Sequence, residues 1–185
     1  IQMVSNHLRS KRNGLRNQTI FLLSVKSGLR SKEISDLKWC EVCGSDGEVG
    51  DYINLTNSTS KGKSGRTIPL NKEVKNNLIE LLKDQKKFKN FDISNYTVVQ
   101  TERSVSASPQ SIVNMFQRWY RTLGLVGCSS HSGRRTFVTE TSKKISLVGG
   151  SLKDIQMMVG HKSLQTTQRY IEGDSESQRK VVDLI

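Results

Sequence analysis

Residues 17–39, NQTIFLLSVKSGLRSKEISDLKW, give the clearest indication of the fold. Asn17–Gly28 predicts a helix, because its apolar residues recur at helical spacing until a Ser-Gly pair interrupts them. Ser31 begins a second helix, since it suits the N-cap position and Glu33 falls in the first turn. We therefore expect a helix, a tight turn and a short second helix that ends near Trp39.

A polar segment rich in Gly, Ser, Thr and Asn follows this helix pair. It contains two short runs, Tyr52–Leu55 and Arg66–Leu70, that are typical of strands. Their separation predicts an antiparallel hairpin whose loop carries Lys61-Gly62-Lys63-Ser64-Gly65. The sequence therefore indicates one small sheet.

Helical patterns dominate the rest of the chain. Their apolar residues return every three or four positions, and breaks near Gly124 and Gly160 separate them. About seven helices beside one small antiparallel sheet give an α+β, mainly α fold class in one compact domain. The helices expected after the hairpin span Asn71–Lys87, 108–124, 130–145, 152–159 and 163–171.

The composition points to a polyanionic partner. The 185 residues include 29 Lys plus Arg against 17 Asp plus Glu, a formal net charge of +12. Nucleic acid is favoured because its phosphates reward many basic side chains at once, although a ribosomal or membrane-surface protein would carry a similar charge. No apolar run approaches the roughly 18–20 residues that span a bilayer, so no membrane partner is expected. The start lacks a secretory signal and a Met, so we expect a fragment of a cytoplasmic protein.

The three cysteines, an odd number, indicate a reducing compartment rather than a disulfide framework. Cys40 and Cys43 form a C-x-x-C pair, but a structural zinc site needs four ligands, and only Cys128 and scattered histidines remain. We interpret Cys40 and Cys43 as ordinary, partly buried residues in a strand and turn. The sequence has no P-loop, dinucleotide-binding glycine motif or acidic magnesium cluster, so neither a metal nor a cofactor is expected.

Several residues of chemical interest stand apart in the sequence. Each has an ordinary explanation by itself: an arginine between helices is usually solvated or paired, a loop lysine faces solvent, and a tyrosine anchors a core. His131 and Arg134 differ, because residues three apart share a helix face and can together grip an oxyanion while exchanging a proton. The full set is Arg30 in the predicted turn, Lys61 in the hairpin loop, His131, Arg134, His161 after Gly160, and Tyr170.

Four ordered motifs resemble those of tyrosine recombinases, the phage integrase family. The first surrounds Arg30 in residues 27–39, and the second places Lys61 eight residues before a proline. HSGRRTF at residues 131–137 is similar to the family's H-x-x-R motif, and GHKSLQTTQRY at residues 160–170 is similar to its closing motif. The resemblance therefore spans nearly the whole chain in the right order.

The H-x-x-R motif departs from the family pattern at two positions. Gly133 stands where a leucine is common, and Arg135 stands where a histidine is common. We expect Gly133 to remove an apolar contact and to add flexibility to the helix. Neither departure touches a position that would take part in the chemistry, and together they favour a mobile element over a chromosomal system.

The resemblance implies strand transfer through a 3′-phosphotyrosyl intermediate, with Tyr170 as the nucleophile and no cofactor. Arg30 and Arg134 would stabilise the negative charge that grows on the phosphate oxygens. Lys61, with Lys63 as the alternative, would protonate the departing 5′ oxygen. His131 would take or hold the tyrosine proton, His161 would hydrogen-bond the phosphate, and Glu33 would support the site.

The resemblance also implies a site-specific recombinase or integrase that acts on double-stranded DNA and integrates or excises a mobile element. Residues 1–172 would form the catalytic domain, without the family's N-terminal core-binding domain. A homotetramer on two recombination sites is implied, in which residues 173–185 dock on a neighbouring protomer; packing of this tail on its own domain stays open. Two other functions stay open as well: a type IB topoisomerase, and a basic nucleic-acid-binding module without catalysis.

Overall fold

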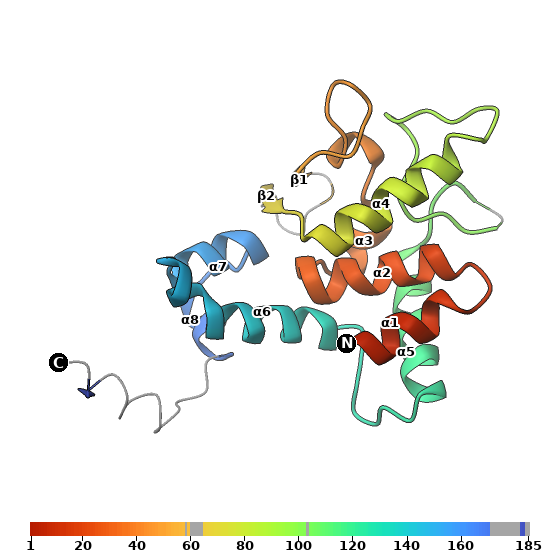
Figure 1. The fold of residues 1–185 in the computed structure, drawn as a ribbon. Helices are drawn as coiled ribbons and strands as arrows, with labels where there is room; N and C mark the ends of the chain where they lie inside the picture. Colours follow the sequence, from red (N-terminus) through yellow and green to blue (C-terminus); the bar gives the residue numbers. More distant parts are fainter. Residues whose placement is uncertain (58, 60–64, 103, 171–181, 184–185) are drawn as a thin grey trace.

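The fold is mainly helical and carries one two-stranded antiparallel sheet (Figure 1), which confirms the predicted α+β, mainly α class. The computed structural model describes residues 1–57, 59, 65–102, 104–170 and 182–183. No helix within these ranges is long and apolar enough to cross a membrane. The described elements, in chain order, are α1 (Gln2–Arg9), α2 (Gly14–Ser27), α3 (Ser31–Asp36), the 3₁₀ helix η1 (Trp39–Glu41), β1 (Tyr52–Leu55), β2 (Arg66–Pro69), α4 (Lys72–Gln85), α5 (Pro109–Thr122), α6 (Ser132–Lys144), the 3₁₀ helix η2 (Ile145–Val148), α7 (Leu152–Val159) and α8 (Leu164–Gln168).

The predicted helix pair corresponds to α2 and α3, and the turn between them depends on Gly28. This residue has a φ of 68°, in the left-handed region that favours glycine. A Cβ added to Gly28 would lie 2.5 Å from Cδ1 of Phe137, a residue of α6. Gly28 therefore permits both the turn and the close packing of α6 beside it.

Helix α1 lies outside the sequence-based prediction, and α2 begins at Gly14 rather than at Asn17. Val4 and Leu8 of α1 are buried in the main core, while Gln2, Asn6 and Arg9 are polar and exposed. A helix this short is stabilised by packing on its neighbours more than by its own sequence. Its hydrophobic pattern is therefore too brief to stand out in the sequence.

The predicted hairpin is formed by β1 and β2. The strands are antiparallel, with Tyr52 opposite Pro69 and Leu55 opposite Arg66. Ile53 and Ile68 face each other across the pair and are buried in the core. Lys61 and Lys63, which the sequence places in the hairpin loop, lie outside the described residues.

The interior has two hydrophobic clusters. The larger one is built from α1 to α5 and the hairpin, and it includes the fully buried Trp39, whose Nε1 donates a hydrogen bond of 2.8 Å to Oε1 of Gln85. The smaller one contains Val138, Ile155 and Val159 of α6 and α7. Figure 1 shows α6, α7 and α8 grouped at one side of the molecule, beyond the C-terminal end of α2. The candidate site lies where these two parts meet.

The three cysteines are free. Cys40 is exposed and lies in η1 rather than in a strand, so this part of the prediction is wrong. Cys43 is partly buried, and burial raises the pKa of its thiol to about 11. Among the described residues, no group of three or more His, Cys, Asp or Glu side chains is arranged to hold a metal ion.

Candidate active site

A buried carboxylate, Glu33, stands at the centre of the candidate site. It is 0% exposed and lies in the first turn of α3. Its Oε1 accepts hydrogen bonds from Nη1 of Arg30 at 2.8 Å and from Nη1 of Arg66 at 2.9 Å. Its Oε2 accepts from Nη2 of Arg66 at 3.0 Å and from the backbone N–H of Arg30 at 2.8 Å. We call Arg30, Glu33, Arg66 and Arg134 the Glu33 cluster.

Glu33 is ionised in this setting. Burial by itself raises the pKa of the carboxyl group, but the hydrogen bonds and charges of Arg66 and Arg30 outweigh it and hold the pKa below the ordinary value of 4.5. The carboxylate therefore fixes two guanidinium groups at one place. Sharing one negative charge between two arginines leaves the cluster with net positive charge.

The end of α7 holds all three arginines of the Glu33 cluster. A helix C-terminus carries unpaired carbonyls and a partial negative charge, both of which favour guanidinium groups. Three consecutive carbonyls at this end each accept from a different arginine. The bonds are Arg66 Nε to Met158 O at 2.7 Å, Arg134 Nη2 to Val159 O at 2.6 Å, and Arg30 Nη2 to Gly160 O at 3.5 Å.

Of the two arginines predicted to bind phosphate, Arg134 is the more deeply buried. Arg134 is 6% exposed, and its Nη1 donates a hydrogen bond of 2.6 Å to the carbonyl oxygen of Gly28. Burial, and then the positive charge of Arg30, lower the pKa of Arg134 to about 9. Arg134 is therefore still protonated at neutral pH, and its guanidinium is held between the α2–α3 turn and α7.

Gly133 allows α6 to approach α2 closely, which places the Arg134 side chain in the site. It is buried, and a Cβ added to it would lie 2.3 Å from Oγ of Ser24 in α2. No side chain fits at this distance without a shift of one helix. The sequence-based expectation of a lost apolar contact therefore needs correction, because the glycine allows a helix–helix contact that a leucine would obstruct.

His161 and Tyr170 complete the group. Gly160 ends α7 with a φ of 63°, which turns the chain so that His161 lies beside the cluster. Nδ1 of His161 and Oγ1 of Thr167 are 3.0 Å apart and share a hydrogen bond. The His161 and Tyr170 rings are stacked with centroids 5.9 Å apart and an interplanar angle of 15°.

Burial and the charges of the cluster together set the protonation state of His161. Burial, followed by the positive charges of Arg134, Arg30 and Arg66, lowers its pKa to about 4. The imidazole is therefore neutral at physiological pH. Within the part of the chain that the structure describes, its Nε2 has no hydrogen-bond partner, so this atom is available to a ligand.

One predicted site residue, His131, is not part of this group. His131 is an exposed residue at the N-cap of α6, and its ring makes no hydrogen bond or ion pair within the described ranges. Lys61 lies outside the described residues. The structure therefore brings together Arg30, Glu33, Arg134, His161 and Tyr170. The chemical roles of these residues, like those of His131 and Lys61, stay predictions.

Two members of the site, Arg66 and Thr167, have no role in the sequence-based prediction. Thr167 is fully buried, and a threonine in a polar helix gives little indication of this in the sequence. Arg66 had a clearer indication. In a strand, alternate residues share a face, so Arg66 shares a face with the buried Ile68. A charged residue on a core-facing position needs a buried partner.

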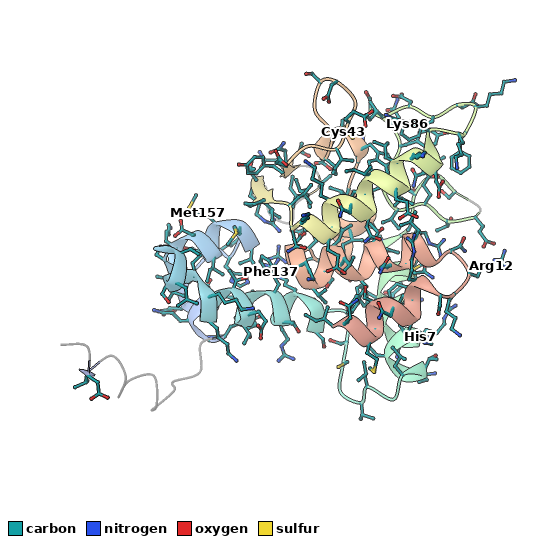
Figure 2. All side chains as sticks on the ribbon, in the orientation of Figure 1. His7, Arg12, Cys43, Lys86, Phe137 and Met157 are labelled. Atoms are coloured by element: carbon teal, nitrogen blue, oxygen red, sulfur yellow. The ribbon has the colours of Figure 1, made fainter. Side chains whose placement is uncertain are left out.

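A cavity of about 450 Å³ opens between β2 and α7 beside the cluster. Arg66, Gly160 and His161 line it, together with Lys153 and Lys162. In Figure 2, Met157 of α7, which also lines the cavity, and Phe137 of α6 mark this side of the molecule. The cavity therefore presents positive charge to an anionic ligand next to the stacked His161 and Tyr170.

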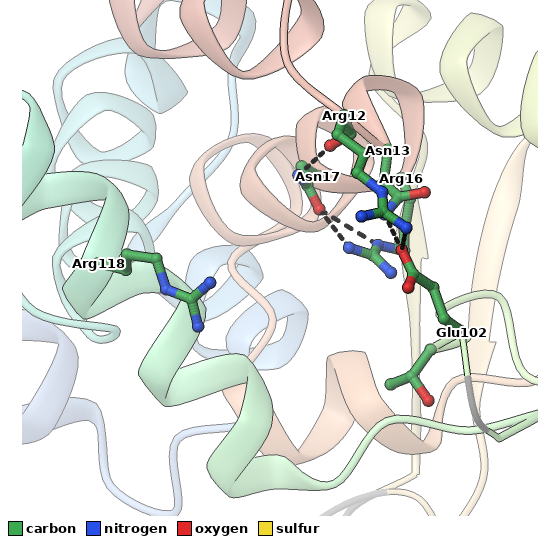
Figure 3. Close-up of a pocket in the computed structure, with 7 residues that line it drawn as sticks. Arg12, Asn13, Arg16, Asn17, Glu102 and Arg118 are labelled. Atoms are coloured by element: carbon green, nitrogen blue, oxygen red, sulfur yellow. Dashed lines mark hydrogen bonds and ion pairs between the residues drawn. The ribbon is translucent and has the colours of Figure 1, made fainter.

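A second group of arginines lies at the other end of α2 (Figure 3) and lines a pocket of about 430 Å³. Arg16 donates to Oδ1 of Asn17 at 2.9 and 3.1 Å and to the carbonyl of Gln100 at 3.2 Å. Arg12 forms an ion pair of 2.9 Å with a carboxylate oxygen of Glu102. We call Arg12, Arg16, Arg118 and Glu102 the α2 N-terminal cluster.

The phage integrase family model matches residues 1–177. Tyrosine recombinase XerA of Pyrococcus horikoshii is 27% identical over 173 residues, which cover 92% of this chain and 55% of the relative. Tyrosine recombinase XerC of Bradyrhizobium diazoefficiens is 31% identical over 163 residues, covering 87% of this chain and 47% of the relative. The chain thus spans about half the length of these curated relatives.

A solved structure agrees with the fold. The Tn1549 transposon integrase in complex with circular intermediate DNA superposes with a TM-score of 0.74 at 18% identity, covering 98% of this chain and 64% of that one. At this identity the similarity supports the fold alone. Because the family model covers 177 of the 185 residues and the helical architecture agrees with a solved integrase, the chain belongs to the phage integrase family of tyrosine recombinases.

Proposed function

We propose that this domain cuts and rejoins DNA strands with Tyr170 as the nucleophile. The main support for the proposal is that Tyr170 stacks on His161. His161 is neutral and lies near the guanidinium groups around Glu33. This places a hydroxyl nucleophile, a neutral hydrogen-bonding group and fixed positive charge in one site. These are the groups that a phosphodiester needs for attack without a metal ion.

The reaction is a transesterification in which the numbers of phosphoester bonds before and after are equal. The Tyr170 oxygen loses its proton and bonds to phosphorus, while the bond from phosphorus to the 5′ oxygen breaks and that oxygen takes up a proton. Rejoining reverses these steps with a new 5′ hydroxyl. The energy of the cut bond is thereby kept in the phosphotyrosine.

The arginines supply charge stabilisation in this proposal. The Arg30 side chain is 24% exposed, so its guanidinium can reach a phosphate from a position fixed by Glu33 and Gly160. Arg134 lies deeper and contributes its charge from a fixed position. Fixed donors aimed at developing charge do not reorganise during the reaction, which makes them effective.

His161 suits the role of a phosphate ligand. Because its Nδ1 is engaged with Thr167, Nε2 is the atom that would meet a phosphate oxygen. If the Thr167 hydroxyl donates to Nδ1, then Nε2 carries the proton and can donate it in a hydrogen bond. Protonation of the leaving group by Lys61, or by Lys63, and proton transfer by His131 complete the proposed mechanism.

The wider function is also a proposal. We assign double-stranded DNA as the substrate, since the Tn1549 integrase was solved with DNA and the chain carries a net charge of +12. Relatives include Xer recombinases as well as a transposon integrase, and we favour integration or excision of a mobile element. A homotetramer on two sites, with residues 173–185 docked on a neighbour, is the proposed assembly; most of this tail lies outside the described residues.

The test is capture of the covalent intermediate. The chain is incubated with a tiled set of nicked DNA duplexes from the DNA that flanks its gene, and products are separated on a denaturing gel. We expect a protein–DNA adduct that maps to Tyr170 by peptide mass spectrometry and is lost in Tyr170→Phe, while DNA binding is unchanged. Tyr52→Phe is the matched control, because Tyr52 is an exposed tyrosine on β1 and its variant should form the adduct.

Two results would count against the proposal. One is an adduct that persists in Tyr170→Phe or maps to another residue. The other is salt-dependent binding to the duplexes without any adduct across the whole set, which is the behaviour of a binding module.

A further inference from the structure

Arg66 is fully engaged inside the protein. Its side chain is 6% exposed, and each of its three guanidinium nitrogens donates to a protein acceptor. Two of these bonds form a fork on Glu33, and the third reaches the Met158 carbonyl. Arg66 also lines the cavity beside the cluster, but every one of its guanidinium nitrogens is bonded to the protein. The side chain is therefore poorly placed to touch DNA, and any effect on the reaction must act through its neighbours.

The most important of these neighbours is Arg30, because both arginines use the same carboxylate. Arg66 occupies both oxygens of Glu33, and the Arg30 backbone N–H also occupies Oε2. The Arg30 guanidinium therefore reaches Glu33 through Nη1 alone, whereas an arginine and a carboxylate usually form a two-bond fork when nothing prevents it. The rest of the Arg30 guanidinium is directed to Gly160 and to solvent.

The charge balance leads to the same conclusion. With both arginines present, one negative charge faces two positive charges. The positive charge of Arg30 is then only partly neutralised, and the remainder can attract an anionic ligand. Without Arg66, the ionised Glu33 would neutralise Arg30 alone and would be free to form a fork with it. A carboxylate that neutralises Arg30 competes directly with a DNA phosphate.

Arg66 also connects the elements that carry other site residues. It begins β2, bonds to α3 through Glu33, and bonds to the end of α7 through Met158. A Cβ on Gly160 would lie 3.0 Å from Nη1 of Arg66, so this guanidinium packs directly against the residue before His161. The side chain therefore fixes the spacing between Arg30 and His161.

We propose that Arg66 is a positioning residue that keeps Arg30 available to the scissile phosphate by sharing Glu33. The inference rests on the proposed function of this site. It assigns to Arg66 no contact with DNA, and it makes Glu33 inhibitory whenever Arg66 is missing. This last consequence separates the proposal from a purely structural role.

The first experiment compares Arg66→Met with the double variant Glu33→Gln/Arg66→Met. At saturating DNA, the cleavage rate of Arg66→Met should fall roughly 10- to 100-fold, as for other displacements of a catalytic group, while the Kd for DNA stays within about threefold. In the double variant, the neutral amide no longer neutralises Arg30, so a large part of the rate should return. Arg12→Met is the control for loss of an arginine elsewhere and should cleave normally.

A second substrate identifies the step that is lost. A 5′-bridging phosphorothiolate has a sulfur leaving group that departs without a proton, so a defect in protonation is rescued and a defect in phosphate charge stabilisation is not. Arg66→Met should stay slow on this substrate. Lys61→Ala should be rescued if the lysine is the acid.

A third measurement needs no cleavage and so is independent of the proposed function. In the Tyr170→Phe background, inorganic phosphate is titrated while the side-chain Nε–Hε NMR signal of Arg30 is followed. Arg66→Met should weaken phosphate binding several-fold, and adding Glu33→Gln should restore it. Absence of any adduct from the wild-type chain would count against the proposed function only, since this titration would still decide the role of Arg66.

Any of three results would overturn the inference. These are a normal cleavage rate in Arg66→Met, no recovery of rate or of phosphate binding on adding Glu33→Gln, and rescue of Arg66→Met by the phosphorothiolate. Thermal unfolding of each variant checks that it is folded. If Arg66→Met does not fold, Arg66→Lys replaces it in these experiments. The lysine variant should show a smaller defect of the same kind, because its ammonium group keeps the positive charge but cannot form the two-bond fork on Glu33.

Discussion

The Glu33 cluster and the α2 N-terminal cluster each combine three arginines with one carboxylate, yet they differ in almost every physical respect. The Glu33 side chain is 0% exposed, whereas the side chains of Glu102 and Arg12 are 54% and 83% exposed. Figure 3 shows Arg118 on α5, standing apart from the other arginines of its cluster. Figure 2 places Arg12 across the molecule from Phe137 and Met157.

Burial and fixed acceptors distinguish the arginines of the candidate catalytic site from those of the other cluster. In the Glu33 cluster, a buried carboxylate and the carbonyls of the last turn of α7 fix the guanidinium groups in a setting of low dielectric. In the α2 N-terminal cluster, Arg12 meets its partner in water, where an ion pair contributes little and fixes no geometry. The two clusters have the same number of arginines, but they differ in how deeply the ion pairs are buried and in how many fixed acceptors hold the guanidinium groups.

The largest expected difference is in stability. Glu33→Ala should lower the free energy of unfolding by about 3–5 kcal/mol, because it leaves the buried Arg66 without its carboxylate. Glu102→Ala should lower it by about 0–1 kcal/mol, as exposed ion pairs do. Urea unfolding followed by circular dichroism gives both values. Losses of equal size would show that burial does not separate the two clusters.

The next difference is in catalysis. Arg134→Gln should reduce the rate of covalent adduct formation by roughly 100- to 1,000-fold, the usual effect of removing a fixed electrostatic group that stabilises the transition state. Arg118→Gln, an exposed arginine of the other cluster, should change the rate by less than about threefold. Adduct formation on a nicked duplex, at DNA concentrations that saturate each variant, makes the comparison. A comparable loss in Arg118→Gln would place the second cluster in the reaction.

Local patterns in the sequence were sufficient for much of the fold. The helix pair joined at Gly28 and the hairpin both follow from short-range rules on helix ends and alternating residues. Helix α1 does not, since only Val4 and Leu8 form its apolar face and their burial depends on the rest of the core. Sequence patterns predict an element well when its stability is local.

Only the site residues that belong to a recognisable sequence motif could be predicted. Motif spacing singled out Arg30, Arg134, His161 and Tyr170, which the structure brings together. Gly133 could not be interpreted correctly, because its purpose is the approach of α6 to Ser24, a contact between residues far apart in the chain. The same holds for the bonds of several arginines to a single helix end, which only the folded chain reveals.

The smallest expected effect, and the most direct probe of the electric field in the Glu33 cluster, is the pKa of His161. NMR of the His161 ring signals should show a neutral imidazole that takes up its proton only near pH 4, since burial and the surrounding arginines disfavour the charged form. Removing one positive charge in Arg134→Gln should raise this pKa toward the ordinary value of 6.5. Arg12→Gln, at the other cluster, should leave it unchanged.

The direction of the pKa shift of His161 also fixes a pH dependence of stability. Because the folded state holds His161 neutral while the unfolded state protonates near pH 6.5, the unfolded chain binds more protons between pH 6.5 and about 4. The contribution of His161 to stability is therefore complete above pH 6.5 and declines as the pH falls through this window. Arg134→Gln should make that decline smaller, which urea unfolding at pH 7 and pH 5 can measure. A His161 titration near pH 6.5 in the wild-type chain would contradict the picture of an imidazole held neutral by burial and by the arginines of the Glu33 cluster.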